Sequence, residues 1–232
     1  MLIPLMQSIY KYIFSLLLCL VIYNLQAQDN KVKADTIKTV WLNGVTPFVD
    51  FASLISSSIS NGETYSMEGG VQVAIKHKYF PVFEIGFAGA DKISNNNITF
   101  NTNAFFGRVG IDFNLSKTKK DTNPTNNLFF GGIRLGYTNF NYNITNALIK
   151  DSYWGGEESL SFNNQNATKI WYELVGGIRV EVFKNIFMGW TVRNKNLLGS
   201  DAVGAVFPWY IPGYGINTSS NWTLNYIVGY RF

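Results

Sequence analysis

The stretch that decides the predicted fold is the last one, Trp222-Thr-Leu-Asn-Tyr-Ile-Val-Gly-Tyr-Arg-Phe232. Every second residue from Trp222 to Phe232 is apolar or aromatic, and most residues between them are polar or small. A period of two places alternate side chains on opposite faces of a β-strand. The stretch therefore predicts a strand with one apolar face, formed by Leu224, Tyr226, Val228, Tyr230 and Phe232 besides Trp222.

Seven earlier segments show the same alternation of apolar with polar or small residues. They cover residues 43–52, 64–76, 81–90, 98–115, 128–140, 169–183 and 186–196. Segments of about ten residues that alternate in this way, separated by turn residues, are typical of transmembrane β-barrels. The sequence therefore predicts an all-β fold, an eight-stranded antiparallel up-and-down transmembrane β-barrel over residues 43–232.

The connections between these segments differ in length. Lys184-Asn185 is a two-residue hairpin turn, and residues 76–80 form another short turn, whereas 141–168 and 197–218 are long. Short turns on the periplasmic rim and long loops on the outer rim are typical of outer-membrane barrels. An even number of strands then places both termini in the periplasm.

The N-terminal sequence predicts a segment that directs secretion. Lys11 precedes an apolar run of about eleven residues, and Ala27 precedes a polar segment, a pattern typical of a secretory signal peptide. The run is shorter than the roughly 20 residues of a membrane-spanning helix. We expect residues 1–27 to be a signal peptide that carries away Cys19, the only cysteine, and residues 28–42 to be a periplasmic lead-in.

Composition excludes several classes of protein. The formal charge of +4 is modest and the lysines are scattered, which argues against nucleic acid as a partner. The mean hydropathy of +0.02 is below that of helical membrane proteins, but alternating strands average to such a value. Without clusters of histidine or thiol, no metal or other cofactor is expected.

The polar parity of the strands holds all five arginines and several acids. A solvated strand face carries Lys and Glu freely, whereas Arg suits enclosed pairing with carboxylates. We therefore expect the apolar face to point outward to lipid and the charges to pair within the barrel; the alternative is a soluble lipocalin-like barrel. The predicted internal ion-pair network is Asp50, Glu68, Glu84, Arg108, Asp112, Arg134, Glu173, Arg179, Glu181, Arg193 and Arg231.

No catalytic site is predicted. His77, the only histidine, falls in a predicted periplasmic turn between two lysines, away from the outer rim where barrel enzymes act on lipid. The internal carboxylates are better explained as structural ion pairs than as an acid–base pair. Aromatic residues such as Trp190, Tyr172, Trp222 and Tyr230 suit the interfacial belts of a membrane protein.

One long loop is unusually apolar, with Phe207, Trp209, Tyr210, Ile211 and Tyr214 close together. An exposed patch of this kind marks a contact with protein or lipid. The alternative is that the loop packs on itself as a cap over the mouth of the barrel, and the sequence leaves both open.

Four short motifs carry a resemblance to a known family. Asp35-Thr-Ile-Lys38, Val109-Gly-Ile-Asp-Phe113, Trp171-Tyr-Glu-Leu174 and Trp209-Tyr-Ile-Pro-Gly-Tyr214 resemble a family of small outer-membrane barrels from Bacteroidota-type bacteria. The final strand is similar to the C-terminal signal of such barrels, and the architecture to OmpA- and OmpX-type barrels. The resemblance implies no activity.

The sequence thus favours a non-enzymatic barrel of the outer membrane of a Gram-negative cell. Its expected partners are outer-membrane lipid, the barrel-assembly machinery during insertion and an envelope protein that contacts the long loops. It would serve as a structural scaffold or a subunit of an envelope complex. The alternatives are a small transporter or channel for apolar solutes and a lipid-modifying barrel enzyme.

Overall fold

The computed structural model describes residues 41–59, 62–116, 127–150, 157–199 and 206–232. The predicted signal peptide and most of the predicted lead-in lie outside these residues. Two compact units divide the chain, and the described residues belong to the larger one, which spans residues 38–118 and 124–232.

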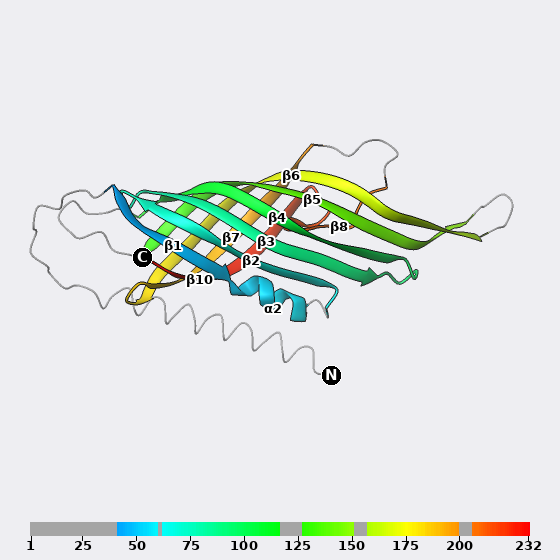
Figure 1. The fold of residues 1–232 in the computed structure, drawn as a ribbon, viewed down its shortest axis with the longest axis horizontal. Helices are drawn as coiled ribbons and strands as arrows, with labels where there is room; N and C mark the ends of the chain where they lie inside the picture. Colours follow the sequence, from blue (N-terminus) through cyan, green and yellow to red (C-terminus); the bar gives the residue numbers. More distant parts are fainter. Residues whose placement is uncertain (1–40, 60–61, 117–126, 151–156, 200–205) are drawn as a thin grey trace, which may run out of the picture. The chain divides into compact units, whose positions relative to one another are not determined.

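Eight antiparallel strands form a closed ring (Figure 1). Each strand pairs with its neighbour in the sequence, and the last of the eight returns to pair with the first. The eight-stranded antiparallel all-β prediction is therefore confirmed. The strands are β1 (Leu42–Asp50), β2 (Thr64–Ile75), β3 (Tyr79–Ile93), β4 (Thr99–Asn114), β5 (Leu128–Lys150), β6 (Glu157–Phe183), β7 (Ile186–Leu198) and β10 (Ser220–Tyr230).

The prediction of a long connection over residues 141–168 is wrong, because the actual connection is much shorter. β5 runs to Lys150 and β6 starts at Glu157, so most of this segment is a two-stranded ribbon that continues past the other strands (Figure 1). The alternation is lost there because two register shifts interrupt the pairing, between Tyr142 and Ile144 and between Ile144 and Ala147. Asparagine side chains stabilise the ribbon across the strands: Asn166 Nδ2 donates to Asn141 Oδ1 at 2.8 Å.

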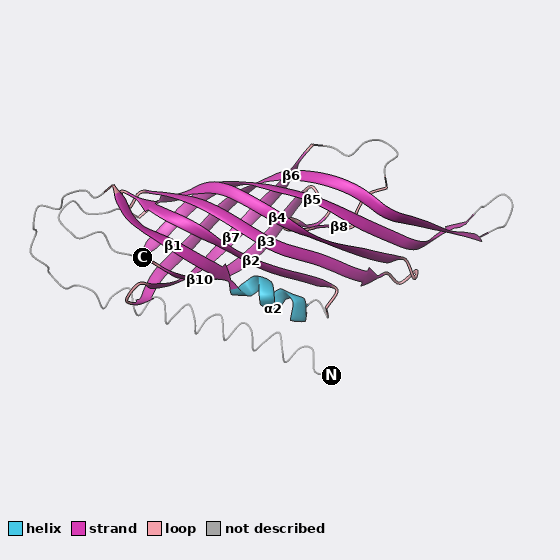
Figure 2. Cartoon of the chain, viewed as in Figure 1, coloured by secondary structure: helices cyan, strands magenta, loops and turns pink. Residues whose placement is uncertain are grey.

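A helix, α2 (Phe51–Ile59), follows β1 directly and was not predicted (Figure 2). It is the only helix among the described residues, and it is too short to cross a membrane. The alternation predicts a first strand that runs to residue 52. The structure ends it at Asp50, because the Asp50 carboxylate caps the helix by accepting from Ala52 N at 2.9 Å.

The helix takes the place of a strand in part of the wall. β1 reaches only as far as the pair Asp50–Ile227, so the part of β10 before Ile227 has no β1 partner. The same holds for the part of β2 before Glu68. Helix α2 contacts both β2 and β10, and it therefore lies across the interval that the short first strand leaves.

Asp50 joins this helix to the ring. The Oδ1 atom that caps the helix also accepts from the backbone Tyr226 N at 3.0 Å, where β10 has lost its ladder partner. Oδ2 accepts from Asn225 Nδ2, a second contact with β10. One buried carboxylate therefore begins the helix and holds the last strand to the first.

The interior of the ring has three layers along its axis. An apolar layer near the short turns contains Ala74, Phe80, Leu128, Phe130 and Val175. The charged residues described below fill the middle. The third layer, near the long connections, is mainly aromatic and contains Ala88, Ala90, Phe100, Phe106, Phe140, Tyr142, Trp171, Tyr210, Ile211 and Tyr214. The charges are thus enclosed between two apolar layers.

Replacing Asp50 tests its double role. Asp50→Ala removes the helix cap and leaves Tyr226 N without its acceptor, so we expect the free energy of unfolding to fall by about 2 to 4 kcal/mol. Asp50→Asn keeps an acceptor oxygen and should lose less than half as much. Urea unfolding of the folded protein, followed by tryptophan fluorescence, measures both, and equal losses would contradict the role of the oxygen as acceptor.

Candidate functional site

The candidate site is the charged middle layer of the ring, which centres on Glu84 of β3. Three guanidinium groups surround this carboxylate. Arg193 approaches with two nitrogens, at 2.8 and 3.2 Å, Arg108 NH1 lies at 3.2 Å, and Arg134 NH1 lies at 3.1 Å. All four side chains are buried, so these contacts form in a medium that screens charge poorly.

Further carboxylates complete the charge balance. Glu68 Oε2 accepts from Arg108 NH1 at 2.6 Å, and Glu173 Oε1 lies 2.7 Å from Arg108 Nε. Asp112 Oδ2 accepts from Arg134 NH2 at 3.1 Å. Each of the three central arginines therefore contacts at least two carboxylates, the arrangement that a buried guanidinium requires.

The register of the strands produces these contacts. Glu84 lies directly opposite Arg108 on β4, and Arg134 lies directly opposite Glu173 on β6. Such cross-strand neighbours have Cβ atoms roughly 5 Å apart on one face of the sheet. Because side chains alternate, every charge on the inward parity of a strand faces the axis of the ring.

The structure brings together most of the predicted network. Eight of its members are buried in the middle layer and linked directly or through Asn225: Asp50, Glu68, Glu84, Arg108, Asp112, Arg134, Glu173 and Arg193. Arg179 is also buried, but its guanidinium lies over the ring of Phe187 and over that of Phe80, which belongs to the apolar layer near the short turns. Glu181 and Arg231 lie at the short-turn end, where the Arg231 guanidinium stacks on Phe187.

Uncharged polar residues connect the network and were not predicted. Gln72 donates to Asp112 Oδ2 at 2.9 Å and accepts from Arg179 NH1. Asn225 donates to Glu68 Oε1 at 2.9 Å and to Asp50, which bridges two acids that face each other across β1 and β2. Both share the inward parity with the charged residues. The alternation of their strands would therefore have been enough to predict that Gln72 and Asn225 point inward.

The apolar loop forms a cap that contacts this network. It contains the short pair β8 (Tyr210–Ile211) and β9 (Gly215–Ile216). Between them the Gly213 carbonyl oxygen accepts from Arg108 NH2 and Lys195 Nζ, each at 2.8 Å. Gly213 has a φ of +80°, and a Cβ there would collide with the ring of Phe106, so only glycine fits.

The cap places the five predicted partner residues in two groups. Tyr210, Ile211 and Tyr214 are buried in the aromatic layer, where Tyr214 packs against Trp171 with ring centroids 6.0 Å apart. Burial raises the pKa of Tyr210 to about 12, so its phenol is neutral at pH 7. Phe207 is exposed, and Trp209 is half-buried against Phe100. Most of the described part of this loop therefore packs as a cap.

His77 lies in the turn between β2 and β3, far along the strands from the cap. Its backbone N donates to Asn43 Oδ1 at 3.1 Å, and its carbonyl oxygen accepts from Asn114 Nδ2 at 3.0 Å. Burial and the nearby Arg231 guanidinium lower the pKa of its imidazole below 6.5. In the described ranges, no group of three or more His, Cys, Asp or Glu residues could hold a metal ion.

This arrangement is suited to holding eight strands together. The central carboxylates already accept from buried guanidinium groups, and apolar layers separate them from both ends of the ring. The printed contacts of these charges are with one another, with neighbouring polar side chains and with the cap.

Neutralising Glu84 tests the importance of the network. Glu84→Gln leaves three buried guanidinium groups without their shared carboxylate, so we expect the free energy of unfolding to fall by about 3 to 5 kcal/mol. Glu63→Gln is the matched control. It removes a partly exposed carboxylate 2.9 Å from Lys92 Nζ, and such pairs contribute only about 0 to 1 kcal/mol. Similar losses for both variants in urea titrations would contradict the central role of Glu84.

Comparison with known proteins adds a family. The family model described as "Domain of unknown function (DUF6048)" matches residues 9–232, which is nearly the whole chain. No curated protein matches the sequence. The match includes all the strands of the ring, the charged layer and the cap. The chain belongs to the DUF6048 family.

Proposed function

We propose that this chain is an integral outer-membrane β-barrel with a filled, charge-paired interior, and that it serves as a structural, loop-presenting scaffold rather than an enzyme. One observation carries the proposal: the ring is polar inside and apolar outside. Large apolar side chains lie exposed on the strands, while arginines and acids are buried within.

The exposed fractions show this inversion along single strands. On β10, Trp222 and Leu224 are 72% and 53% exposed, whereas the adjacent Asn225 is 7% exposed. On β4, Phe105 is 69% exposed and Arg108 only 3%. A barrel surrounded by water would have the opposite arrangement.

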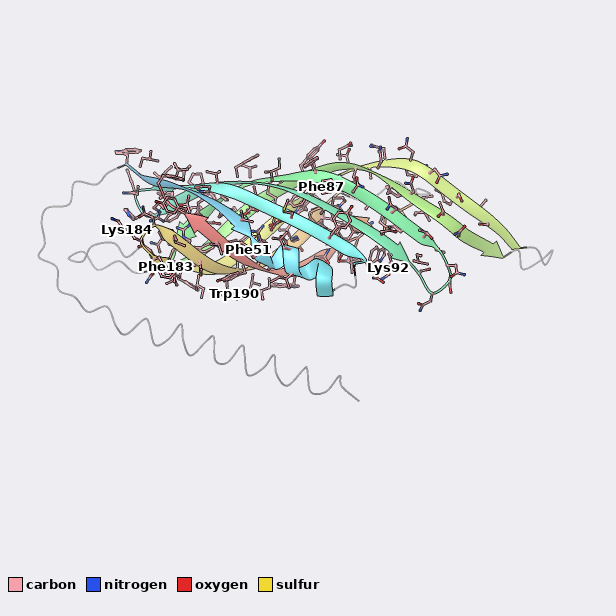
Figure 3. The ribbon with its side chains drawn as sticks, turned by 60° about the horizontal axis from the view of Figure 1, so that its bottom comes forward. Phe51, Phe87, Lys92, Phe183, Lys184 and Trp190 are labelled. Carbon is pink, nitrogen blue, oxygen red and sulfur yellow. The ribbon has the colours of Figure 1, made fainter. Side chains whose placement is uncertain are left out.

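The outward residues form a continuous apolar surface across neighbouring strands. Tyr65, Phe87 and Phe105 pack side by side over β2, β3 and β4, with ring centroids 6.2 and 5.0 Å apart. Trp190 and Tyr226 do the same over β7 and β10, at 4.6 Å. The labelled Phe87, Phe183 and Trp190 lie on the outside of the strands in Figure 3. An exposed apolar surface of this extent indicates contact with lipid or protein.

Closure of the ring supports a lipid environment. Hydrocarbon offers no hydrogen-bond partner, so a membrane-spanning sheet must pair its first and last strands. β1 and β10 pair, and reciprocal backbone bonds between Val45 and Phe232 continue this pairing. Where β1 ends, helix α2 forms backbone hydrogen bonds within itself except in its first and last turns, and the Asp50 carboxylate caps the first turn.

The filled interior favours a scaffold over a transporter. The charged layer and the aromatic layer occupy the axis, and the cap folds onto them through Gly213. What the ring would present outside the membrane is the polar ribbon of β5 and β6 together with the exposed edge of the cap. An envelope protein that binds these elements is the partner we propose.

Substituting an outward residue tests the membrane proposal. Leu224→Arg places a charge on the lipid-facing surface, and we expect it to lower the free energy of unfolding in lipid vesicles by roughly 2 to 4 kcal/mol. Asn163→Arg, the control, adds the same side chain to the exposed ribbon and should have no such effect. The proposal also requires the natural protein to fractionate with outer membranes. Fractionation with soluble proteins, or unchanged stability of Leu224→Arg, would contradict it.

A further inference from the structure

A small cavity lies between the charged layer and the apolar layer near the short turns. Every strand of the ring contributes to its lining, so the cavity lies on the axis. Its volume is about 10 Å³, which is at the lower limit for a single water-sized group. Its polar lining includes Gln72, Arg134, Arg179, Thr191 and Arg193.

Hydrogen-bond donors around this cavity outnumber acceptors. Within the described part of the chain, Arg179 Nε and NH2, Thr191 Oγ1 and Arg193 Nε have no hydrogen-bond partner. These three side chains are at most 4% exposed, so bulk water does not reach them. Buried donors without partners destabilise the folded state, and charged donors do so most. Such a cluster of donors requires an acceptor among them.

The residues that line the cavity carry more positive than negative charge. The lining contains three guanidinium groups, of Arg134, Arg179 and Arg193, but only two carboxylates, of Glu84 and Asp112. Glu84 already lies beside Arg134 and Arg193, and Asp112 already accepts from Arg134. Arg179 contacts Gln72 and two aromatic rings, and its counter-charge among the described residues is Asp112, which it meets through Gln72. A buried cation without a direct ion-pair partner is unfavourable.

We propose that this cavity binds one monatomic anion of the halide class, with chloride as the physiological ligand. The anion would accept from Arg179 and Thr191 and supply the negative charge that the lining lacks. The volume excludes sulfate and phosphate, which have five heavy atoms each. Chloride is itself larger than water, so the lining side chains must move outward when it binds. A water molecule would fit the space as it stands, but it would leave Arg179 without a directly bound counter-charge. The proposal is independent of whether the ring lies in a membrane.

Anion-dependent unfolding tests this site in the purified, folded full-length protein. We expect sodium chloride and sodium bromide to raise the unfolding midpoint above that in sodium gluconate at the same ionic strength, and the increase to saturate with concentration as for a single site. Thr191→Val, which keeps the volume but removes the hydroxyl, should lose most of this increase. Arg179→Gln should abolish it if the variant folds.

Thr138→Val is the matched control. Thr138 is also buried on the inward side of a strand, but its Oγ1 donates to the Phe105 carbonyl oxygen at 3.0 Å and it does not line the cavity. This variant should keep the full halide effect, whatever its stability. Crystals soaked in bromide should show an anomalous peak between Arg179 and Thr191. Equal midpoints in chloride and gluconate, or no bromide peak at the cavity, would overturn the proposal in favour of water.

Discussion

The pairing of guanidinium groups with carboxylates on the axis of the ring is the constraint on which the rest of the structure depends. Isolated, each of these charges would be too costly to bury. Together, Glu84 and its three arginines connect β3, β4, β5 and β7, and Glu68 and Glu173 bring in β2 and β6. The ion pairs therefore link six of the strands across the axis, and they form in the register that the backbone ladder sets.

Buried polar groups also hold the cap and the place where β1 gives way to helix α2. At one end, Arg108 and Lys195 hold the Gly213 carbonyl, so the cap is attached by charge and then packed by Tyr214 and Ile211. Where β1 ends, the Asp50 carboxylate accepts the hydrogen bond from Tyr226 N that a longer β1 would have accepted, and it also caps helix α2. Polar groups inside the ring thus stabilise its two irregular features, the cap and helix α2.

Much of this architecture could be predicted from the alternation of apolar and polar residues, because that pattern can be read within each strand separately. The parity of Leu224 and Asn225 separates exposed from buried positions on β10, and the same parity places Arg108 and Glu173 inward. Helix α2 escaped prediction because Phe51 continues the alternation of β1, although the cap from Asp50 to Ala52 N is itself local. The extension of β5 and β6 escaped because register shifts break the period, and the pairing of individual charges depends on registers that no single strand encodes.

The most direct test of the account uses its native tryptophans as probes of lipid contact. Trp190 and Trp222 lie on the outside of the ring, whereas Trp171 is fully buried inside and donates to Glu173 Oε1 at 2.7 Å. Variants that keep one of these three, with the other tryptophans replaced by phenylalanine, can be folded into vesicles whose phospholipids carry bromine on their acyl chains. The account predicts strong quenching of Trp190 and Trp222 and little quenching of Trp171. Equal quenching of all three, or quenching of Trp171 alone, would contradict it.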